Sequence, residues 1–147
     1  MNNPILIPFI AEHILSLINR DVNFKEEFRL ALEKERGGPA FTAIFDSKII
    51  GCAGVIIPWE GVGIAWTALN KDIELHKFWM ARVIKRILKD VIKFYNLHRV
   101  EAVVILNDSF IRNRDWLKLL GFTREIGMAK KYTPDKLSAV RYELIKD

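Results

Sequence analysis

Residues 62–106 read VGIAWTALNKDIELHKFWMARVIKRILKDVIKFYNLHRVEAVVIL, and this stretch decides the fold. It opens with a run of strand-forming residues, Val62 to Leu69, and closes with an almost wholly apolar run, Val100 to Leu106. Between them, from Glu74 to Tyr95, the apolar residues recur with the period of an α-helix. A strand, a helix and a second strand in this order predict a right-handed crossover between two parallel strands.

The predicted helix has an apolar stripe and a basic remainder. The stripe should pack on the sheet, and its members are Leu75, Phe78, Trp79, Val83, Ile84, Ile87, Leu88, Val91, Ile92 and Tyr95. Asn96 is a natural residue to end the helix. Residues 74–99 hold seven lysines and arginines against two acidic residues, a surplus equal to the net charge of +5 of the whole chain. A row of basic residues of this kind attracts phosphates, nucleic acid or an acidic protein, and it is also typical of an ordinary solvated helix face.

The rest of the chain predicts antiparallel structure around this stretch. Before it we expect an edge strand at residues 5–10, two helices at 11–19 and 24–35, and two strands at 41–45 and 49–57 that form a β-meander with the strand 62–69. After it we expect a short helix closed by Gly121 and two final strands, at residues 111–120, 122–131 and 140–145. The order β-α-α-β-β-β-α-β-α-β-β, with a mixed sheet, predicts the α+β class and a single domain over residues 1–147.

The composition excludes several classes of protein. Half of the residues are hydrophobic and 28% are charged, which is typical of a globular chain and excludes disordered and collagen-like classes. The one cysteine, Cys52, excludes an intrachain disulfide and a CxxC metal site, and its apolar neighbours predict a buried side chain. No apolar run approaches the roughly 18 residues of a membrane span, and the N-terminus lacks a basic leader. We therefore expect a cytoplasmic protein with no membrane partner and no metal site.

A second stretch, residues 107–122, reads NDSFIRNRDWLKLLGF. Its end, Leu117 to Phe122, resembles the L-x-x-x-G-F signature of the Gcn5-related N-acetyltransferase (GNAT) family, and the predicted element order is that of the GNAT fold. The chain is most similar to a phage and prophage branch that includes small internal virion proteins. That branch shares the strand end at residues 65–67, Ala-Trp-Thr, the basic helix that follows, and the Asn, Ser, Ile-Arg and Trp-Leu positions of residues 107–117.

The resemblance implies an N-acyltransferase that moves an acyl group from acetyl-CoA, or from another acyl-CoA, to an amine. In the family, a loop and a helix N-terminus bind the pyrophosphate, and a strand backbone polarises the thioester carbonyl and pairs with the pantetheine arm. The residues at these positions are Trp66, Thr67, Ala68, Leu69, Lys71, His76, Lys77 and Asn107. Lys71, His76 and Lys77 would serve the pyrophosphate, and the others would serve the thioester and the pantetheine.

Proton transfer has two candidates under the same resemblance. Glu60, at the start of a strand, lies where some members place a general base. Ser109 could replace the tyrosine that protonates the leaving thiolate, because Leu117 stands at that position. Each residue has a structural interpretation as well: Glu60 as a turn residue, Ser109 as a helix N-cap and Trp66 as a core residue.

Departures from the family pattern leave a second function open. Residues 70–81 contain no glycine, so the backbone cannot approach a pyrophosphate as closely as a glycine loop does, and Phe78 and Trp79 would crowd it. We favour the enzyme. The alternative is a catalytically degenerate GNAT-fold phage or prophage protein with a structural, ejected or host-interacting role, which would associate with the virion.

The partners follow from these two functions. The acceptor would be a small-molecule or protein amine, and a homodimer or a phage or host protein partner stays open. Nucleic-acid binding by residues 77–99 is not expected, because no RNA- or DNA-binding motif is present and the aromatic residues lie on the apolar side. A steep salt dependence of DNA binding would revive it. Of the histidines, His13 and His98 look structural, and His76 lies near the presumed site.

Overall fold

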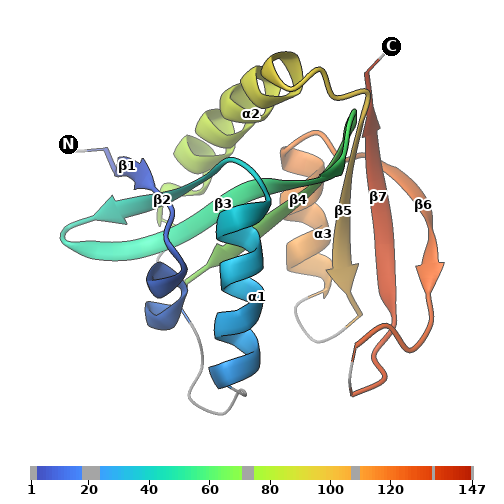
Figure 1. Ribbon diagram of the computed structural model, residues 1–147, viewed down its shortest axis with the longest axis horizontal. Coiled ribbons are helices and arrows are strands. Elements are labelled where there is room, and N and C mark those ends of the chain that lie inside the picture. Colours follow the sequence, from blue (N-terminus) through green and yellow to red (C-terminus); the bar gives the residue numbers. More distant parts are fainter. Residues whose placement is uncertain (1–2, 18–23, 71–74, 107–109, 134, 147) are drawn as a thin grey trace. The chain divides into compact units, whose positions relative to one another are not determined.

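A computed structural model describes the chain except for residues 1–2, 18–23, 71–74, 107–109, 134 and 147. The described strands form one mixed sheet with the order β1-β2-β3-β4-β5-β7-β6, accompanied by α-helices and a 3-10 helix, η1 (Figure 1). The elements in chain order are β1 (Ile5–Pro8), η1 (Ala11–Ser16), α1 (Phe24–Gly37), β2 (Ala40–Phe45), β3 (Lys48–Trp59), β4 (Val62–Leu69), α2 (Lys77–Phe94), β5 (Arg99–Ile105), α3 (Phe110–Leu119), β6 (Arg124–Ala129) and β7 (Ala139–Ile145).

The predicted element order and the α+β class are confirmed, with one change of helix type. Residues 11–16 form a 3-10 helix rather than an α-helix. Strands β4 and β5 run parallel, with Val62 opposite Arg99, as the predicted crossover requires. The pairs β1–β2, β2–β3, β5–β7 and β6–β7 are antiparallel. The helical period of the apolar residues at 74–95, between two strand-like runs, therefore predicted the parallel pair correctly.

Helices α2 and α3 end in the same way. Asn96 lies just after α2 with a φ of 51°, and Gly121 lies just after α3 with a φ of 105°, so the backbone adopts a left-handed conformation after each helix. After α2, the N–H of Leu97 donates to the carbonyl of Ile92 over 2.9 Å, which satisfies a carbonyl that the helix leaves free. The helix ends predicted at Asn96 and Gly121 are thus confirmed.

The contacts of the chain divide it into two compact units. Unit 1 comprises Met1–Pro58 and Ala65–Met80, and unit 2 comprises Trp59–Ile64 and Ala81–Asp147. The division passes through β4 and through the first turns of α2. The single domain over residues 1–147 stays a prediction.

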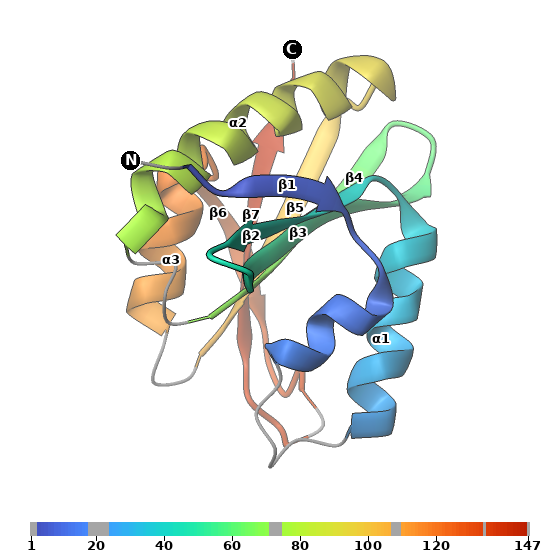
Figure 2. The ribbon, with the colours of Figure 1, turned by 90° about the vertical axis from the view of Figure 1, so that its left-hand side faces the viewer.

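Unit 1 has a core of small and aromatic side chains. The cluster contains Phe9, Ala11, Ile14, Ala31 and Cys52, and η1 lies beside α1 (Figure 2). Cys52 is fully buried, as predicted. Burial raises the pKa of its thiol despite the hydrogen bond to Thr42, which favours the thiol over the reactive thiolate.

Unit 2 has a core in which the middle of α2 is buried together with β5 and β7. The buried side chains of α2 in this unit are Ala81, Val83, Ile84, Leu88, Val91 and Ile92. Val100, Ala102 and Val104 alternate along β5, and Tyr142 is buried on β7. Among the described residues, no helix combines the length and the apolar character that a membrane span requires.

The predicted apolar stripe of α2 is wrong at both ends. Leu75 is 82% exposed, Phe78 is 72% exposed and Tyr95 is 41% exposed. The buried position near the start of α2 belongs to Met80, which is fully buried. Because a helix has about 3.6 residues per turn, residues two apart point to nearly opposite sides, so the burial of Met80 leaves Phe78 in solvent.

Candidate active site

The feature that sets β4 apart is the short length of its pairing with β5. In the described part of the chain, this ladder contains Val62 opposite Arg99, Gly63 opposite Val100 and Ile64 opposite Glu101. Strand β4 continues from there to Leu69. Residues 65–69 therefore have a strand edge that the described β4–β5 ladder does not cover. Backbone N–H and C=O groups on such an edge can pair with the amides of a ligand.

Trp66, in unit 1, is anchored against the core of that unit. Its ring makes an edge contact with the ring of Phe9, with centroids 5.0 Å apart, and Lys34 Nζ lies 5.1 Å from the ring centroid. Burial lowers the pKa of Lys34, while the nearby Glu27 acts in the opposite direction. The indole Nε1 of Trp66 is buried and has no hydrogen-bond partner among the described residues. These contacts support the structural interpretation of Trp66, and its role toward a cofactor stays a prediction.

The residues after Trp66 have different environments. The side chain of Thr67 is exposed, and Ala68 packs against the core of unit 1. The chain leaves β4 at Asn70, whose Nδ2 donates to the carbonyl of Ile49 over 2.8 Å and whose backbone N–H donates to that of Ile50 over 3.1 Å. Sequence reasoning missed the structural role of Asn70, although asparagine at a strand end commonly bonds to nearby backbone.

The start of α2 carries two of the residues predicted to bind pyrophosphate. The ring of His76 lies against the ring of Phe45, with centroids 4.2 Å apart, and Lys77 is the first residue of the helix. The first turn of α2 contains no acidic residue that would offset the partial positive charge of the helix N-terminus, and Asp72 and Glu74, which precede it, lie outside the described residues. Lys71, the third predicted residue, lies outside the described residues. Phe78, which was expected to crowd a pyrophosphate together with Trp79, is exposed, and the crowding stays a prediction.

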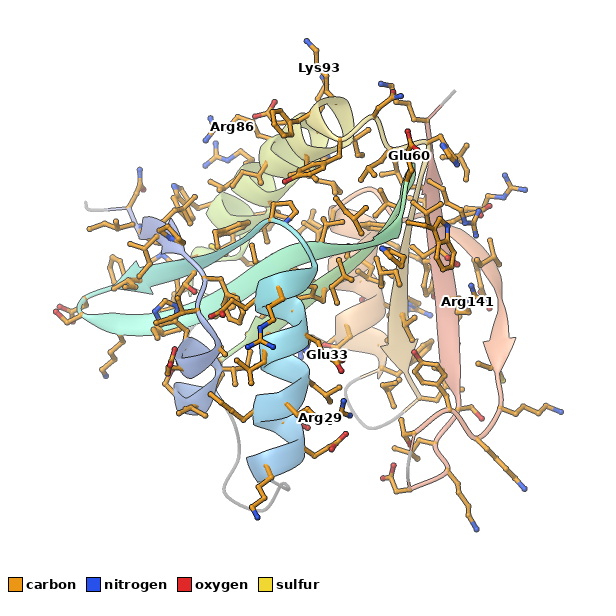
Figure 3. All side chains as sticks on the ribbon, in the orientation of Figure 1. Arg29, Glu33, Glu60, Arg86, Lys93 and Arg141 are labelled. Atoms are coloured by element: carbon orange, nitrogen blue, oxygen red, sulfur yellow. The ribbon has the colours of Figure 1, made fainter. Side chains whose placement is uncertain are left out.

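Glu60, in unit 2, is exposed in the turn before β4 (Figure 3). Strand β3 extends to Trp59, so this turn consists of Glu60 and Gly61. Gly61 has a φ of +85°, and a Cβ there would come within 2.2 Å of Cε1 of His98, which supports a structural role for His98. Glu60 precedes Ile64, where the ladder with β5 ends, by four residues, which is about 13 Å along a strand. A general base must lie within hydrogen-bond distance of its proton or one water away, so the role of Glu60 stays a prediction.

The third group of predicted site residues comes from the segment after β5, and most of it is not described by the structure. Asn107 and Ser109 lie outside the described residues. Leu106 before them is held by its N–H, which donates to the carbonyl of Ser138 over 2.9 Å. Leu117, which the resemblance places at the position of the family's tyrosine, is buried. An apolar buried side chain supplies no proton to a leaving thiolate, so that position contributes packing alone.

Unit 1 also contains a chain of hydrogen-bonded polar side chains, in which Thr42 and Cys52 are buried and His13 is partly buried. The hydroxyl of Thr42 lies 2.7 Å from Nδ1 of His13 and 3.4 Å from the sulfur of Cys52. The backbone N–H of Ile10 also donates to Nδ1 of His13, over 3.3 Å, so this nitrogen is an acceptor and the hydroxyl of Thr42 donates to it. The structural role predicted for His13 is supported. In the described part of the chain, no group of His, Cys, Asp and Glu side chains could hold a metal ion.

Comparison with known proteins gives a result for the fold. No protein-family model matches the chain, and no curated protein matches its sequence. A variant of spermidine N-acetyltransferase SpeG from Vibrio cholerae has a similar structure, with a TM-score of 0.71, 14% identity, and coverage of 96% of this chain and 94% of that chain.

Two further solved structures lead to the same fold. The IAA acetyltransferase from Bacillus cereus has a TM-score of 0.73 at 12% identity, covering 98% of this chain and 100% of its own. An acetyltransferase of the GNAT family from Bacillus anthracis has a TM-score of 0.69 at 13% identity, covering 98% of this chain and 95% of its own. The chain therefore has the fold of the GNAT acetyltransferases, as the sequence predicted. The phage and prophage branch stays a prediction.

Proposed function

We propose that this chain is a GNAT-type N-acyltransferase, which transfers an acyl group from acyl-CoA, acetyl-CoA in the simplest case, to an amine. The observation that supports this most is the early end of the β4–β5 ladder at Ile64 in a chain with the GNAT fold. It leaves the edge of residues 65–69 with backbone groups that suit the amides of a pantetheine arm. Acyl-CoA would supply the activated thioester.

The described residues fit this cofactor in part. On β4, Trp66 is fixed by Phe9 and Lys34, so the backbone beside it is held in place. A backbone N–H of Thr67 or Ala68 would donate to the thioester carbonyl. The first turn of α2, with Lys77 and no acidic residue, suits the pyrophosphate, and His76 lies beside it. Lys71 and Asn107 would complete these contacts.

Catalysis would depend mainly on alignment. Holding the thioester and the amine in line removes much of the barrier, and this needs only a fixed cofactor and a backbone donor. Leu117 provides no proton, and Glu60, exposed in the turn before β4, stays the candidate base. We therefore expect slow turnover, with Ser109 as the remaining candidate donor. The acceptor would be a small molecule or a protein amine in the cytoplasm.

Replacing Glu60 tests this dependence on alignment. Glu60→Gln should reduce kcat/KM by less than about 100-fold, the bottom of the range for a positioned base. The measurement is CoA release with a panel of small amines and peptide N-termini, from pH 6 to pH 9. A larger loss, together with an acidic limb that disappears in the variant, would make Glu60 the general base after all.

Binding of the cofactor is the decisive experiment. Acetyl-CoA at 100 times its Kd should stabilise the protein by about 2.7 kcal/mol, which a thermal shift detects as several degrees. The double variant Lys71→Glu with Lys77→Glu should lose this shift. The matched control, Lys25→Glu with Lys48→Glu, makes the same charge change at exposed lysines of unit 1 and should keep it.

A second function rests on the buried Leu117 at the family's tyrosine position. In this alternative the chain is a catalytically degenerate phage or prophage protein with a structural, ejected or host-interacting role, associated with the virion. No thermal shift with acetyl-CoA or CoA, and no turnover with any amine, would favour it. A shift that both double variants keep would place the cofactor elsewhere on the molecule.

A further inference from the structure

The exposed face of α2 within unit 2 carries a row of positive charges. Arg82, Arg86, Lys89 and Lys93 follow one another at intervals of four, three and four residues, which places them on one face of the helix. Lys85 lies beside them, and all five side chains are exposed. Figure 3 shows Arg86 and Lys93 extending from the helix into solvent. We call these five residues the α2 stripe.

The α2 stripe is not neutralised within the described part of the chain. None of its members takes part in a described salt bridge, and those of unit 2 involve Arg99, Arg114, Arg124 and Arg141 instead. Asp90 is the one acidic residue of α2. Asp90 lies four residues after Arg86 and three before Lys93, so it offsets one of the five positive charges, and the remaining like charges three and four residues apart repel each other.

Two exposed aromatic rings stand at the end of the stripe. Phe94 is 82% exposed and Tyr95 is 41% exposed, and their ring centroids are 5.0 Å apart with an angle of 73° between the planes. The sequence suggested that the aromatic residues of this segment lie on the apolar side, which argued against nucleic-acid binding. The structure places this pair at the surface next to Lys93, so that objection no longer holds.

The chemistry of this surface distinguishes between polyanions. An amphipathic helix binds a lipid surface with its apolar face, but the apolar face of α2 in unit 2 is buried, with Ile84 and Leu88 each less than 8% exposed. The stripe from Arg82 to Lys93 covers eleven steps along the helix, or about 16 Å at 1.5 Å per step. A strand whose bases stay stacked as in a duplex has one phosphate every 3.4 Å, so about five nucleotides of such a strand cover that length. Exposed rings bind the faces of unpaired bases, which a duplex does not offer.

We propose that this surface of α2, from Arg82 to Tyr95, binds single-stranded nucleic acid. The cations of the stripe bind successive phosphates, and the Phe94–Tyr95 pair stacks with a base. The inference goes beyond acyl transfer and does not depend on it, because every residue of the surface belongs to unit 2 and none is assigned to the cofactor.

The test is fluorescence anisotropy of the full chain with labelled 16-nucleotide dT and U strands, between 50 and 200 mM salt. Four or five phosphate contacts should give a slope of about 3 in a plot of log Kd against log salt, at about 0.7 for each contact to a single strand. A duplex of the same length should bind more weakly, because its bases are not available to the two rings.

Variants separate charge from stacking. Arg86→Glu with Lys89→Glu should weaken binding at least tenfold and lower the slope by about 1.4. The matched control, Lys118→Glu with Lys130→Glu, makes the same charge change at exposed residues of unit 2 and should leave the slope unchanged. Phe94→Ala should weaken binding by about 5- to 100-fold with the slope unchanged, and Phe94→Trp should restore it.

Several results would overturn the proposal. An equal loss in the control pair would mean that the net charge of the chain, and not the stripe, attracts the strand. Duplex binding as tight as single-strand binding, with no effect of Phe94→Ala, would remove the stacking role. Tighter, Phe94-dependent binding to vesicles containing 30% phosphatidylserine would assign the surface to lipid, and preferential binding to polyglutamate would assign it to an acidic protein.

Discussion

Two groups of positive charges in unit 2, one on the sheet and one on α2, differ in their surroundings. On the sheet, Arg99 pairs with Glu101 and Glu143, Arg124 pairs with Glu143 over 3.1 Å, and Arg141 pairs with Glu101. On α2, the five cations of the stripe have no described salt bridge. Charges that are matched inside the fold serve its stability, whereas unmatched charges on one helix face are available to a partner. The same residue types therefore have two roles in one unit.

The comparison requires that α2 is held in place by its opposite face. Leu88→Ala should lower the free energy of unfolding by about 2–5 kcal/mol, because Leu88 is only 6% exposed and its removal leaves a cavity. Phe78→Ala, on the exposed side of the same helix, should change it by less than about 0.5 kcal/mol. Urea denaturation followed by circular dichroism measures both. Similar losses in the two variants would mean that the burial pattern of α2 is wrong.

The sheet arginines and their acidic partners, which we call the paired group, should lose stability when one carboxylate is removed. Glu143 is 7% exposed and bonds to Arg99 and Arg124, so Glu143→Gln should cost about 1.5–3 kcal/mol of stability. Arg86→Gln removes one charge from the α2 stripe and should cost less than about 0.5 kcal/mol. Chemical denaturation at pH 7 gives both values. A large loss of stability in Arg86→Gln would show that the α2 stripe has partners within the fold. The two groups of charges would then not differ.

The paired group should also respond to pH. Burial raises the pKa of Glu101, but hydrogen bonds from Arg99 and Arg141 outweigh burial, so the pKa lies below its ordinary value of 4.5. A carboxylate with a lowered pKa in the folded state stabilises the fold above that ordinary value, and the stabilisation is lost as the pH falls through the folded pKa.

We therefore expect Glu101→Gln to destabilise the protein by about 1 kcal/mol or less at pH 7. The difference from the unmodified chain should shrink as the pH falls from 7 toward 3, because the native carboxyl takes up a proton as the pH approaches its lowered pKa. Thermal unfolding at both pH values measures it. A difference that stays the same at pH 3 would mean that Glu101 acts through packing rather than through its charge.

Much of the fold could be predicted because its signals are local. The change of period between Leu69 and Val100 predicted the parallel pair, and Asn96 and Gly121 predicted the helix ends. The candidate site was less accessible to sequence reasoning. Its assignment relied on a resemblance, and of its residues Lys71, Asn107 and Ser109 lie outside the described part of the chain. No local signal marked Ile64 as the end of the β4–β5 ladder.

The apolar period by itself determined where the long helix lies and that it is amphipathic, because each side chain's direction follows from its place in the chain. Only the tertiary structure decided that Met80 is buried while Phe78 and Phe94 are exposed, because burial depends on which elements lie over each turn. The tertiary structure also decided that Arg99 pairs with acidic residues, whereas no salt bridge of Arg86 is found among the described residues. Those partners come from residues distant in sequence, and only folding brings them together.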